Sequence, residues 1–122
     1  MTRDELVWTV GAVGEAPAAT RIVAPAGRVD EASATGFAER LTQEIECATR
    51  DGVSRLAIDL ANIEYMSSRG LRGLTLAQRK SAEHAITIVL AQPNEIMREI
   101  LAISRYDMVF QVFDTIEEAV AA

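Results

Sequence analysis

Short apolar runs alternate with segments of helical periodicity along this chain. The first two runs, residues 6–10 and 20–24, flank a connection at 11–19 and predict an N-terminal hairpin. The second run is expected to end at Pro25 and Gly27, because both residues interrupt regular strands. Three further apolar runs have the length of strands: residues 55–60, 85–90 and 109–113.

Between these runs, apolar residues recur every three or four positions, which is typical of amphipathic helices. The first helical stripe consists of Phe37, Leu41, Ile45 and Ala48. That helix is expected to end at Asp51-Gly52. A second helix, capped by serine, is predicted from Ser67-Ser68 to about Glu83. A third stripe follows Pro93-Asn94 and contains Met97, Ile100 and Leu101.

The C-terminal segment predicts a fourth helix. Asp114, with Glu117 three residues later, resembles a capping box and opens a helix through Val120. The elements then follow the order β-β-α-β-α-β-α-β-α, which is typical of an α/β fold with right-handed crossovers. We expect a mostly parallel central sheet with an N-terminal edge strand and four helices. With 122 residues, 49% of them hydrophobic, the chain is sized for one domain with a substantial core.

Charge and composition narrow the function. Twelve basic residues against 18 acidic ones give a net charge of −6, which argues against nucleic acid and anionic membranes as partners. Cys47 is the only cysteine, and no signal peptide or membrane-length apolar stretch is visible, so we expect a cytoplasmic protein. One cysteine and one histidine, His84, cannot supply a usual zinc shell, and no metal or cofactor is expected.

The candidate chemistry lies in residues 62–74, where a strand leads into the second helix. Ser67 and Ser68 are ordinary helix caps or a phosphorylation site, because a helix N-terminus stabilises added negative charge. Gly70 and Gly73 serve either close packing of the helix or the close approach of a partner. Arg69 and Arg72 are either solvated or paired with an acidic group. Both arginines and Gly70 are candidate contacts with a partner. The segment lacks the Gly-Lys-Ser/Thr ending of a P-loop.

Two residues outside this segment are further candidates for a docking surface. Met97 belongs to an apolar set larger than one buried stripe requires, although service to the core is the simpler interpretation. Asp30 lies at the turn before the first helix, where capping is its simpler role.

The central segment resembles the signature of STAS domains, specifically that of the bacterial anti-sigma factor antagonists. The resemblance rests on a strand ending in Asp, an aromatic-apolar pair, a serine pair and a Gly-Leu, here residues 56–60, Tyr65-Met66, Ser67-Ser68 and Gly70-Leu71. Residues 26–30 and 110–120 resemble the family's Gly-x-x-Asp turn and its closing strand and helix. The similarity covers about residues 5–121, so residues 1–122 are interpreted as a single STAS domain.

The resemblance implies a non-enzymatic binding switch. Such a protein is phosphorylated by an anti-sigma factor serine kinase of the histidine-kinase-like ATPase fold and dephosphorylated by a PP2C-type serine phosphatase. Unphosphorylated, it sequesters the anti-sigma factor and frees a sigma factor. Alignment on Gly70-Leu71 makes Ser68 the phosphoacceptor, with Ser67 as the alternative. This chain departs from the pattern at Ser67, where many members carry Asp, and at Arg69, where many carry Ser or Ala.

Two other functions remain open at this point. A STAS accessory subunit of an ABC-type lipid transporter has the same fold, but its motif more often carries Asp-Thr or Asp-Ser before Ala-Gly-Leu. An enzyme, either a nucleotide hydrolase or a phosphotransfer protein, needs a nucleophile beside a base. His84 is predicted near the opposite end of the helix that begins at Ser68, which disfavours that pairing.

Overall fold

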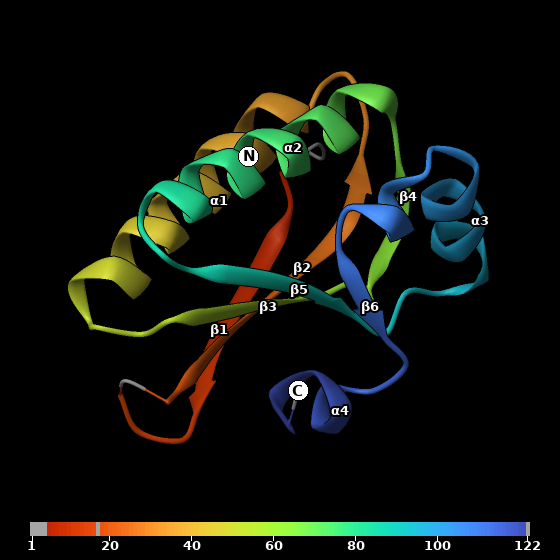
Figure 1. The fold of residues 1–122 in the computed structure, drawn as a ribbon. Helices are drawn as coiled ribbons and strands as arrows, with labels where there is room; N and C mark the ends of the chain where they lie inside the picture. The colour runs from red at the N-terminus through yellow and green to blue at the C-terminus, as the bar shows by residue number, and fades with distance from the viewer. Residues whose placement is uncertain (1–4, 17, 122) are drawn as a thin grey trace.

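The computed structural model describes residues 5–16 and 18–121 and forms an α/β fold around one sheet (Figure 1). In chain order its elements are β1 (Val7–Val13), β2 (Thr20–Val29), α1 (Ala34–Arg50), β3 (Arg55–Asp59), β4 (Ile63–Met66), α2 (Ser68–Glu83), β5 (Thr87–Ala91), α3 (Glu95–Ile103), the 3-10 turn η1 (Tyr106–Met108), β6 (Gln111–Phe113) and α4 (Ile116–Ala121).

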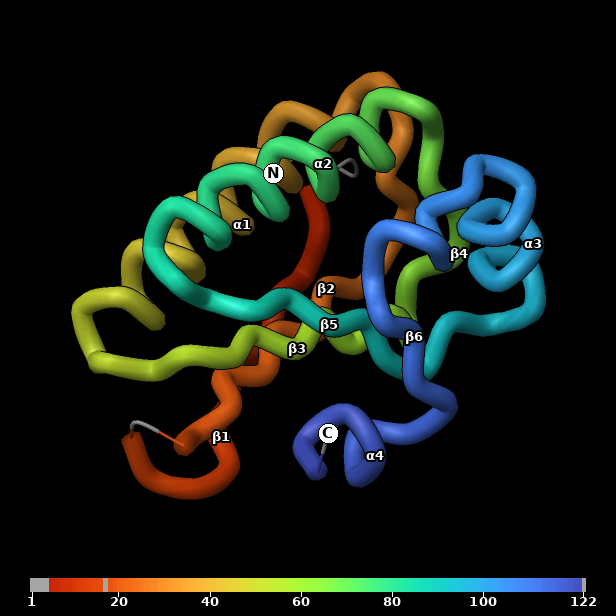
Figure 2. Tube along the Cα trace, in the orientation of Figure 1, coloured from red at the N-terminus to blue at the C-terminus, as the bar shows by residue number. Residues whose placement is uncertain are grey.

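The sheet confirms the predicted class of fold. Its strand order is β1-β2-β3-β5-β6, and β4 pairs with β2 off this path. β1 runs antiparallel to β2 as an edge strand, and the other pairings are parallel. Helices α1 and α2 lie on one face, α4 lies on the opposite face, and α3 lies at the end of the sheet near β4 (Figures 1 and 2). The main core fills the space beneath α1 and α2 and includes Phe37, Leu41, Ile45, Leu56, Ile58, Leu74 and Leu90.

Strand β2 is longer than expected. It continues through Pro25 and Gly27, the two residues predicted to end it. Its pairing with β3 stops at Val23, and its pairing with β4 begins at Gly27. Pro25 therefore lies in the gap between two ladders, where neither needs its missing N–H. Gly27 has φ of +129°, a conformation that favours glycine, and its N–H donates to the carbonyl of Asn62 at 3.0 Å.

Strand β4 is an addition to the prediction, because the apolar runs indicate no strand between residues 60 and 67. Ile63 and Met66 are buried, whereas Glu64 is exposed and Tyr65 is half-buried, so four residues show no clear alternation. Because the strand is this short, its pairing with β2 defines it more than its own pattern does. The strand leads directly into the serine pair and so positions the candidate site.

The C-terminal elements also differ in detail from the prediction. The last strand begins at Gln111 and not at residue 109, because η1 occupies residues 106–108 after Arg105 in the left-handed conformation at φ of 63°. Helix α4 is capped by Thr115, whose Oγ1 accepts from the Glu118 N–H at 3.1 Å. Asp114, the predicted cap, instead pairs with Arg98 at 2.7 Å.

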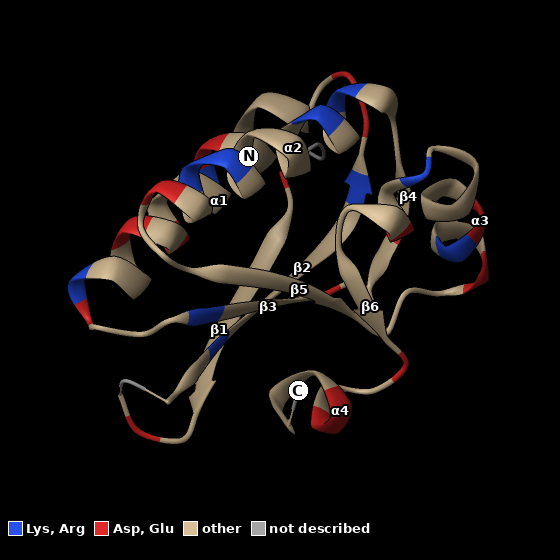
Figure 3. Cartoon of the chain, in the orientation of Figure 1, with Lys and Arg blue, Asp and Glu red and all other residues tan. Residues whose placement is uncertain are grey.

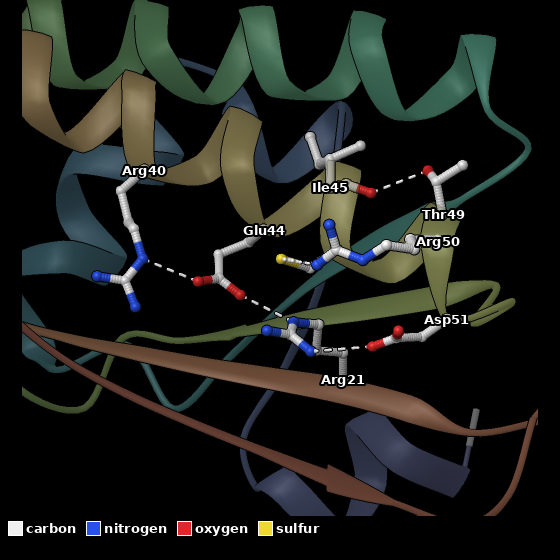
Figure 4. A network of polar contacts seen from close by, with 8 residues as sticks. Arg21, Arg40, Glu44, Ile45, Thr49, Arg50 and Asp51 are labelled. Carbon is white, nitrogen blue, oxygen red and sulfur yellow. Dashed lines mark hydrogen bonds and ion pairs between the residues drawn. The ribbon is translucent and has the colours of Figure 1, made fainter.

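A buried charge network joins α1 to β2 (Figure 4). Glu44 of α1 accepts from Nε of Arg21 on β2 and from Nε of Arg40, each at 2.8 Å. Its side chain is only 5% exposed. Burial alone would raise the pKa of Glu44, but the hydrogen bonds from Arg40 and Arg21 outweigh it and lower the pKa below its ordinary value. The network therefore holds an ionised carboxylate between the helix and the sheet.

Candidate functional site

Strands β2 and β4 end side by side and so bring together two distant parts of the sequence. Val29 pairs with Met66, and the Ser67 N–H donates to the Val29 carbonyl at 2.7 Å. Asp30 and Ser67 are the next residues on the two strands. The turn before α1 and the start of α2 consequently form one surface at the carboxyl end of the sheet (Figure 1).

Ser67, and not Ser68, is the N-cap of α2. The Ser67 Oγ accepts from the Gly70 N–H at 3.3 Å, and its carbonyl accepts from the Leu71 N–H at 3.0 Å. Its backbone is extended, with ψ of 173°, because it continues β4. The Ser67 side chain is buried and already hydrogen-bonded, as a cap requires.

Ser68 is the first residue of α2, and its side chain is exposed. Within residues 5–16 and 18–121, the backbone N–H groups of Ser68 and Arg69 have no hydrogen-bond acceptor. The first N–H groups of a helix cannot find partners inside it, and they attract anions. The Ser68 hydroxyl therefore lies where an attached phosphate would meet unpaired donors.

Gly70 and Gly73 allow α2 to pack closely, which confirms the packing interpretation. A Cβ on Gly70 would lie 2.5 Å from Cγ of Met66 and 2.6 Å from Cγ1 of Val29. A Cβ on Gly73 would lie 3.3 Å from Cδ2 of Phe37 on α1. Gly70 is buried, so the predicted direct contact between this residue and a partner is wrong. Its role is to let the first turn of α2 pack against Met66 and Val29.

Asp30 shapes the turn that borders the site. Its Oδ1 accepts from the N–H groups of Ala32 at 3.1 Å and Ser33 at 3.3 Å. The Ser33 hydroxyl in turn donates to the Arg28 carbonyl at 2.6 Å. Asp30 thus fixes the turn that precedes α1, whose N-cap is Ser33 and not the predicted Asp30, and it stays partly exposed beside Ser67.

Charged side chains surround the exposed serine. Arg69 pairs with Glu31 at 3.0 Å, with 56% and 69% of the two side chains exposed. Figure 3 shows basic residues on the first turns of α2 and acidic residues on the neighbouring loop after β2. No local motif predicts a role for Glu31, because its contact with Arg69 depends on the pairing of β2 with β4.

A shallow groove runs between α1 and α2 next to these charges. Its volume is about 260 Å³. Its lining residues are Ala34, Thr35, Ala38, Glu39, Arg69, Arg72, Gly73 and Leu76. Arg72 is exposed and has no ion-pair partner in the part of the chain that the structure describes. Leu76 is 44% exposed, so the groove offers apolar contact beside unpaired positive charge.

Met97 is not available to a partner, which corrects its proposed contact. Its side chain is fully buried, and its N–H donates to Oδ1 of Asn94 at 2.8 Å as part of the α3 cap. Asn94 also donates to the Ile63 carbonyl at 2.7 Å, which fixes the start of α3 to β4. The large apolar residues of α3 that are exposed are instead Ile96 and Ile103, at 55% and 83%.

Other groups that could act in catalysis or bind a metal are few around the site. His84 is the C-cap of α2, so the full 16-residue helix separates it from Ser68. Among the described residues, no three His, Cys, Asp or Glu side chains are grouped as metal ligands. In residues 5–16 and 18–121, none of the helices has both the length and the apolar character needed to cross a membrane.

The fold and this site define a STAS domain. The STAS domain family model matches residues 13–119, and the chain therefore belongs to that family. A relative from Bordetella bronchiseptica, BtrV, carries the name of an anti-sigma factor antagonist and is 32% identical over 85 residues, covering 70% of this chain and 73% of the relative. Within the STAS domains, the chain is accordingly grouped with the anti-sigma factor antagonists.

Solved structures agree on the fold. A crystal structure from Thermotoga maritima, of a protein named as an anti-sigma factor antagonist, has a TM-score of 0.78 at 18% identity; the match covers 93% of this chain and 92% of that one. The antagonist SpoIIAA in its unphosphorylated form has a TM-score of 0.71 at 17% identity and covers 93% of both chains. A structure of Bacillus SpoIIAA in the phosphorylated form has a TM-score of 0.64 at 17% identity and covers 94% of this chain and 97% of its own.

Proposed function

We propose that this chain is a non-enzymatic switch controlled by phosphorylation of Ser68. In its unphosphorylated form it sequesters an anti-sigma factor that is also a serine kinase, and a sigma factor is thereby freed. The observation that carries the proposal is the difference in position between the two serines: Ser67 is buried as the N-cap of α2, and Ser68 is exposed on the first turn of that helix. A kinase can reach the Ser68 hydroxyl without opening the fold.

Ser68 is the better acceptor of the two serines for a physical reason. Phosphorylation of Ser67 would remove the hydroxyl from its hydrogen bond with Gly70 and force a dianion into a position only 8% exposed. A phosphate on Ser68 would face solvent and the unpaired N–H groups of Ser68 and Arg69. The fold therefore tolerates the modification at Ser68.

Phosphorylation changes binding because the added charge must be desolvated in the complex. A phosphoserine adds nearly two negative charges to the centre of the docking surface. An imperfectly paired charge in an interface weakens binding by several kcal/mol, which is about a thousandfold in affinity. Asp30, Arg69 and Arg72 are proposed to frame the same surface, with the groove between α1 and α2 beside them. Ser67, predicted as a further contact, is buried and supports this surface as the cap of α2.

The proposed partners are those that the resemblance to the anti-sigma factor antagonists implies. The kinase is proposed to have the histidine-kinase-like ATPase fold, and a PP2C-type phosphatase is proposed to restore the unmodified serine. The net charge of −6 supports a protein partner and disfavours nucleic acid or an anionic membrane. We propose action in the cytoplasm without a cofactor. The existence of SpoIIAA structures in both phosphorylation states supports a switch of this kind.

A pull-down from the native cell's lysate tests the switch. Ser68→Ala and Ser68→Glu serve as baits, and recovered proteins are identified by mass spectrometry. We expect the Ala form to retain an ATP-binding kinase-like anti-sigma factor and the Glu form to lose it. Phosphorylation by the recovered kinase should modify Ser67→Ala, the matched control, but not Ser68→Ala. Equal capture by both baits, or a transporter ATPase captured by both, would refute the proposal.

A further inference from the structure

Strand β1 leaves one long edge of the sheet open. It pairs with β2 on one side, and its other side has no strand partner within residues 5–16 and 18–121. All of its seven residues are exposed except Trp8, which is half-buried. The sequence Val-Trp-Thr-Val-Gly-Ala-Val contains no charge and no proline. Natural sheets usually protect their edges with such residues, and an edge without them is a template for another strand.

The opposite edge of the sheet is different. Strand β6 has only three residues and follows directly after the η1 turn. A strand this short offers few free N–H and carbonyl groups and is itself a form of edge protection. The open edge of β1 therefore is not a general property of this sheet.

We infer that β1 pairs antiparallel with β1 of a second copy of this chain, with the two-fold axis at Val10. In this register all seven residues of both strands are used, and Val10 faces its own copy. Trp8 lies opposite Ala12, Thr9 opposite Gly11, and Val7 opposite Val13. In two of these pairs a larger side chain therefore lies opposite a smaller one: the indole of Trp8 opposite the methyl group of Ala12, and the hydroxyl-bearing side chain of Thr9 opposite glycine.

The strand's own properties favour a second copy over an unrelated partner. An isologous pair places identical groups near one another, so a charged strand would repel itself, and β1 carries no charge. Trp8 is already fixed by stacking on Phe37, with ring centroids 5.9 Å apart, and by Arg40, whose guanidinium lies 5.1 Å from the indole centroid. Little side-chain freedom is lost when Trp8 receives Ala12 of the other copy.

Acidic residues flank the strand and make the dimer sensitive to salt. Glu5 precedes β1 and Glu15 follows it, and both are exposed. The antiparallel register brings Glu5 of each copy toward Glu15 of the other, beyond the ends of the ladder. Salt screens exposed charges, so the dimer should tighten between about 0.05 and 0.5 M NaCl.

Sedimentation equilibrium of the full chain tests the inference. At about 100 μM we expect a mass of twice the 13.2 kDa chain. Val10→Lys should weaken the dimer at least about tenfold, because two cations then face each other at the axis. Ile103→Lys on α3 also replaces an exposed apolar residue by lysine, at a position 83% exposed, and should leave the affinity of the dimer unchanged. A wild-type chain that stays monomeric, or a dimer unaffected by Val10→Lys, overturns the inference.

Cysteine cross-linking fixes the register independently of the lysine variant. In a Cys47→Ala background, Val10→Cys places two thiols at the axis, where opposed Cα atoms lie about 4.5–5.5 Å apart, within disulfide range. Val7→Cys is the matched control on the same strand, because its two copies would be about 20 Å apart. Rapid oxidation to a covalent dimer by the Val10→Cys form alone supports the inference. Equal cross-linking of both variants, or of neither, contradicts it.

Discussion

Arginine and glutamate pair in two regions of this molecule under opposite conditions. Between α1 and β2, Glu44 is 5% exposed and receives two hydrogen bonds of 2.8 Å from Arg21 and Arg40. At the start of α2, Arg69 and Glu31 pair at 3.0 Å with more than half of each side chain exposed. Removing an arginine from this network would leave the buried Glu44 carboxylate with one partner in place of two. The exposed pair can exchange partners at little expense, which is what a docking surface requires.

The largest effect is expected from the buried network. Glu44→Gln removes the carboxylate that pairs with Arg21 and Arg40 and leaves Arg21 only Asp51, at 3.7 Å, so the free energy of unfolding at pH 7 should fall by about 3 kcal/mol. Urea unfolding measures it. Glu46→Gln on the same helix is the control, because Glu46 pairs with Lys80 at 3.1 Å with 58% of its side chain exposed. That control should change stability by less than about 0.5 kcal/mol.

The same variant predicts a pH dependence. The pKa of Glu44 is lowered in the folded chain from its ordinary value of 4.5 by the hydrogen bonds from Arg40 and Arg21, which outweigh the effect of burial. The ionised form therefore stabilises the fold above pH 4.5, and this stabilisation is lost as the pH falls through the lowered pKa. The difference between wild type and Glu44→Gln should shrink as the pH is lowered below that value. A difference that stays constant would show that the charge contributes nothing.

The proposed docking surface lies over closely packed residues, and a substitution of Gly70 tests that packing. Gly70→Ala forces a Cβ to within 2.6 Å of Val29 and should lower the free energy of unfolding by about 2 kcal/mol through overpacking. Gly36→Ala is the matched helical control, because a Cβ there meets nothing within 4 Å. That substitution should stabilise the chain by about 0.5–1 kcal/mol. Thermal unfolding of both variants would separate packing from helix propensity, and equal effects would contradict a packing role.

The sequence revealed the scaffold more completely than the site. The stripe of Phe37, Leu41 and Ile45 repeats over several turns, so α1 could be predicted from local periodicity alone. The adjacency of Asp30 and Ser67 depends on the pairing of β2 with the four-residue β4, and no local pattern encodes that pairing. Met97 shows a similar limit, because a stripe predicts which residues are apolar but not which of them another element covers.

The sequence alone does not show which of the two serines is the N-cap of α2. Both are good caps, and only the end of β4 decides which of them begins the helix. Ser67→Ala removes the acceptor for the Gly70 N–H and should lower the free energy of unfolding by about 1 kcal/mol. Ser68→Ala should change it by less than about 0.5 kcal/mol, since the exposed hydroxyl caps nothing. The reverse order in chemical denaturation would assign the cap to Ser68 and undermine the proposed acceptor.

The smallest effect is expected from the exposed pair, and it tests the comparison most directly. A double-mutant cycle with Arg69→Gln and Glu31→Gln should give a coupling energy below about 0.5 kcal/mol, reduced further by salt, because solvent screens both side chains. A coupling of about 2 kcal/mol would instead place this pair in the same class as the Glu44 network. Weak coupling has a functional consequence. If the pairing with Glu31 stabilises Arg69 only weakly, the proposed phosphate on Ser68 or an acidic partner can bind Arg69 without a large loss of stability of the fold.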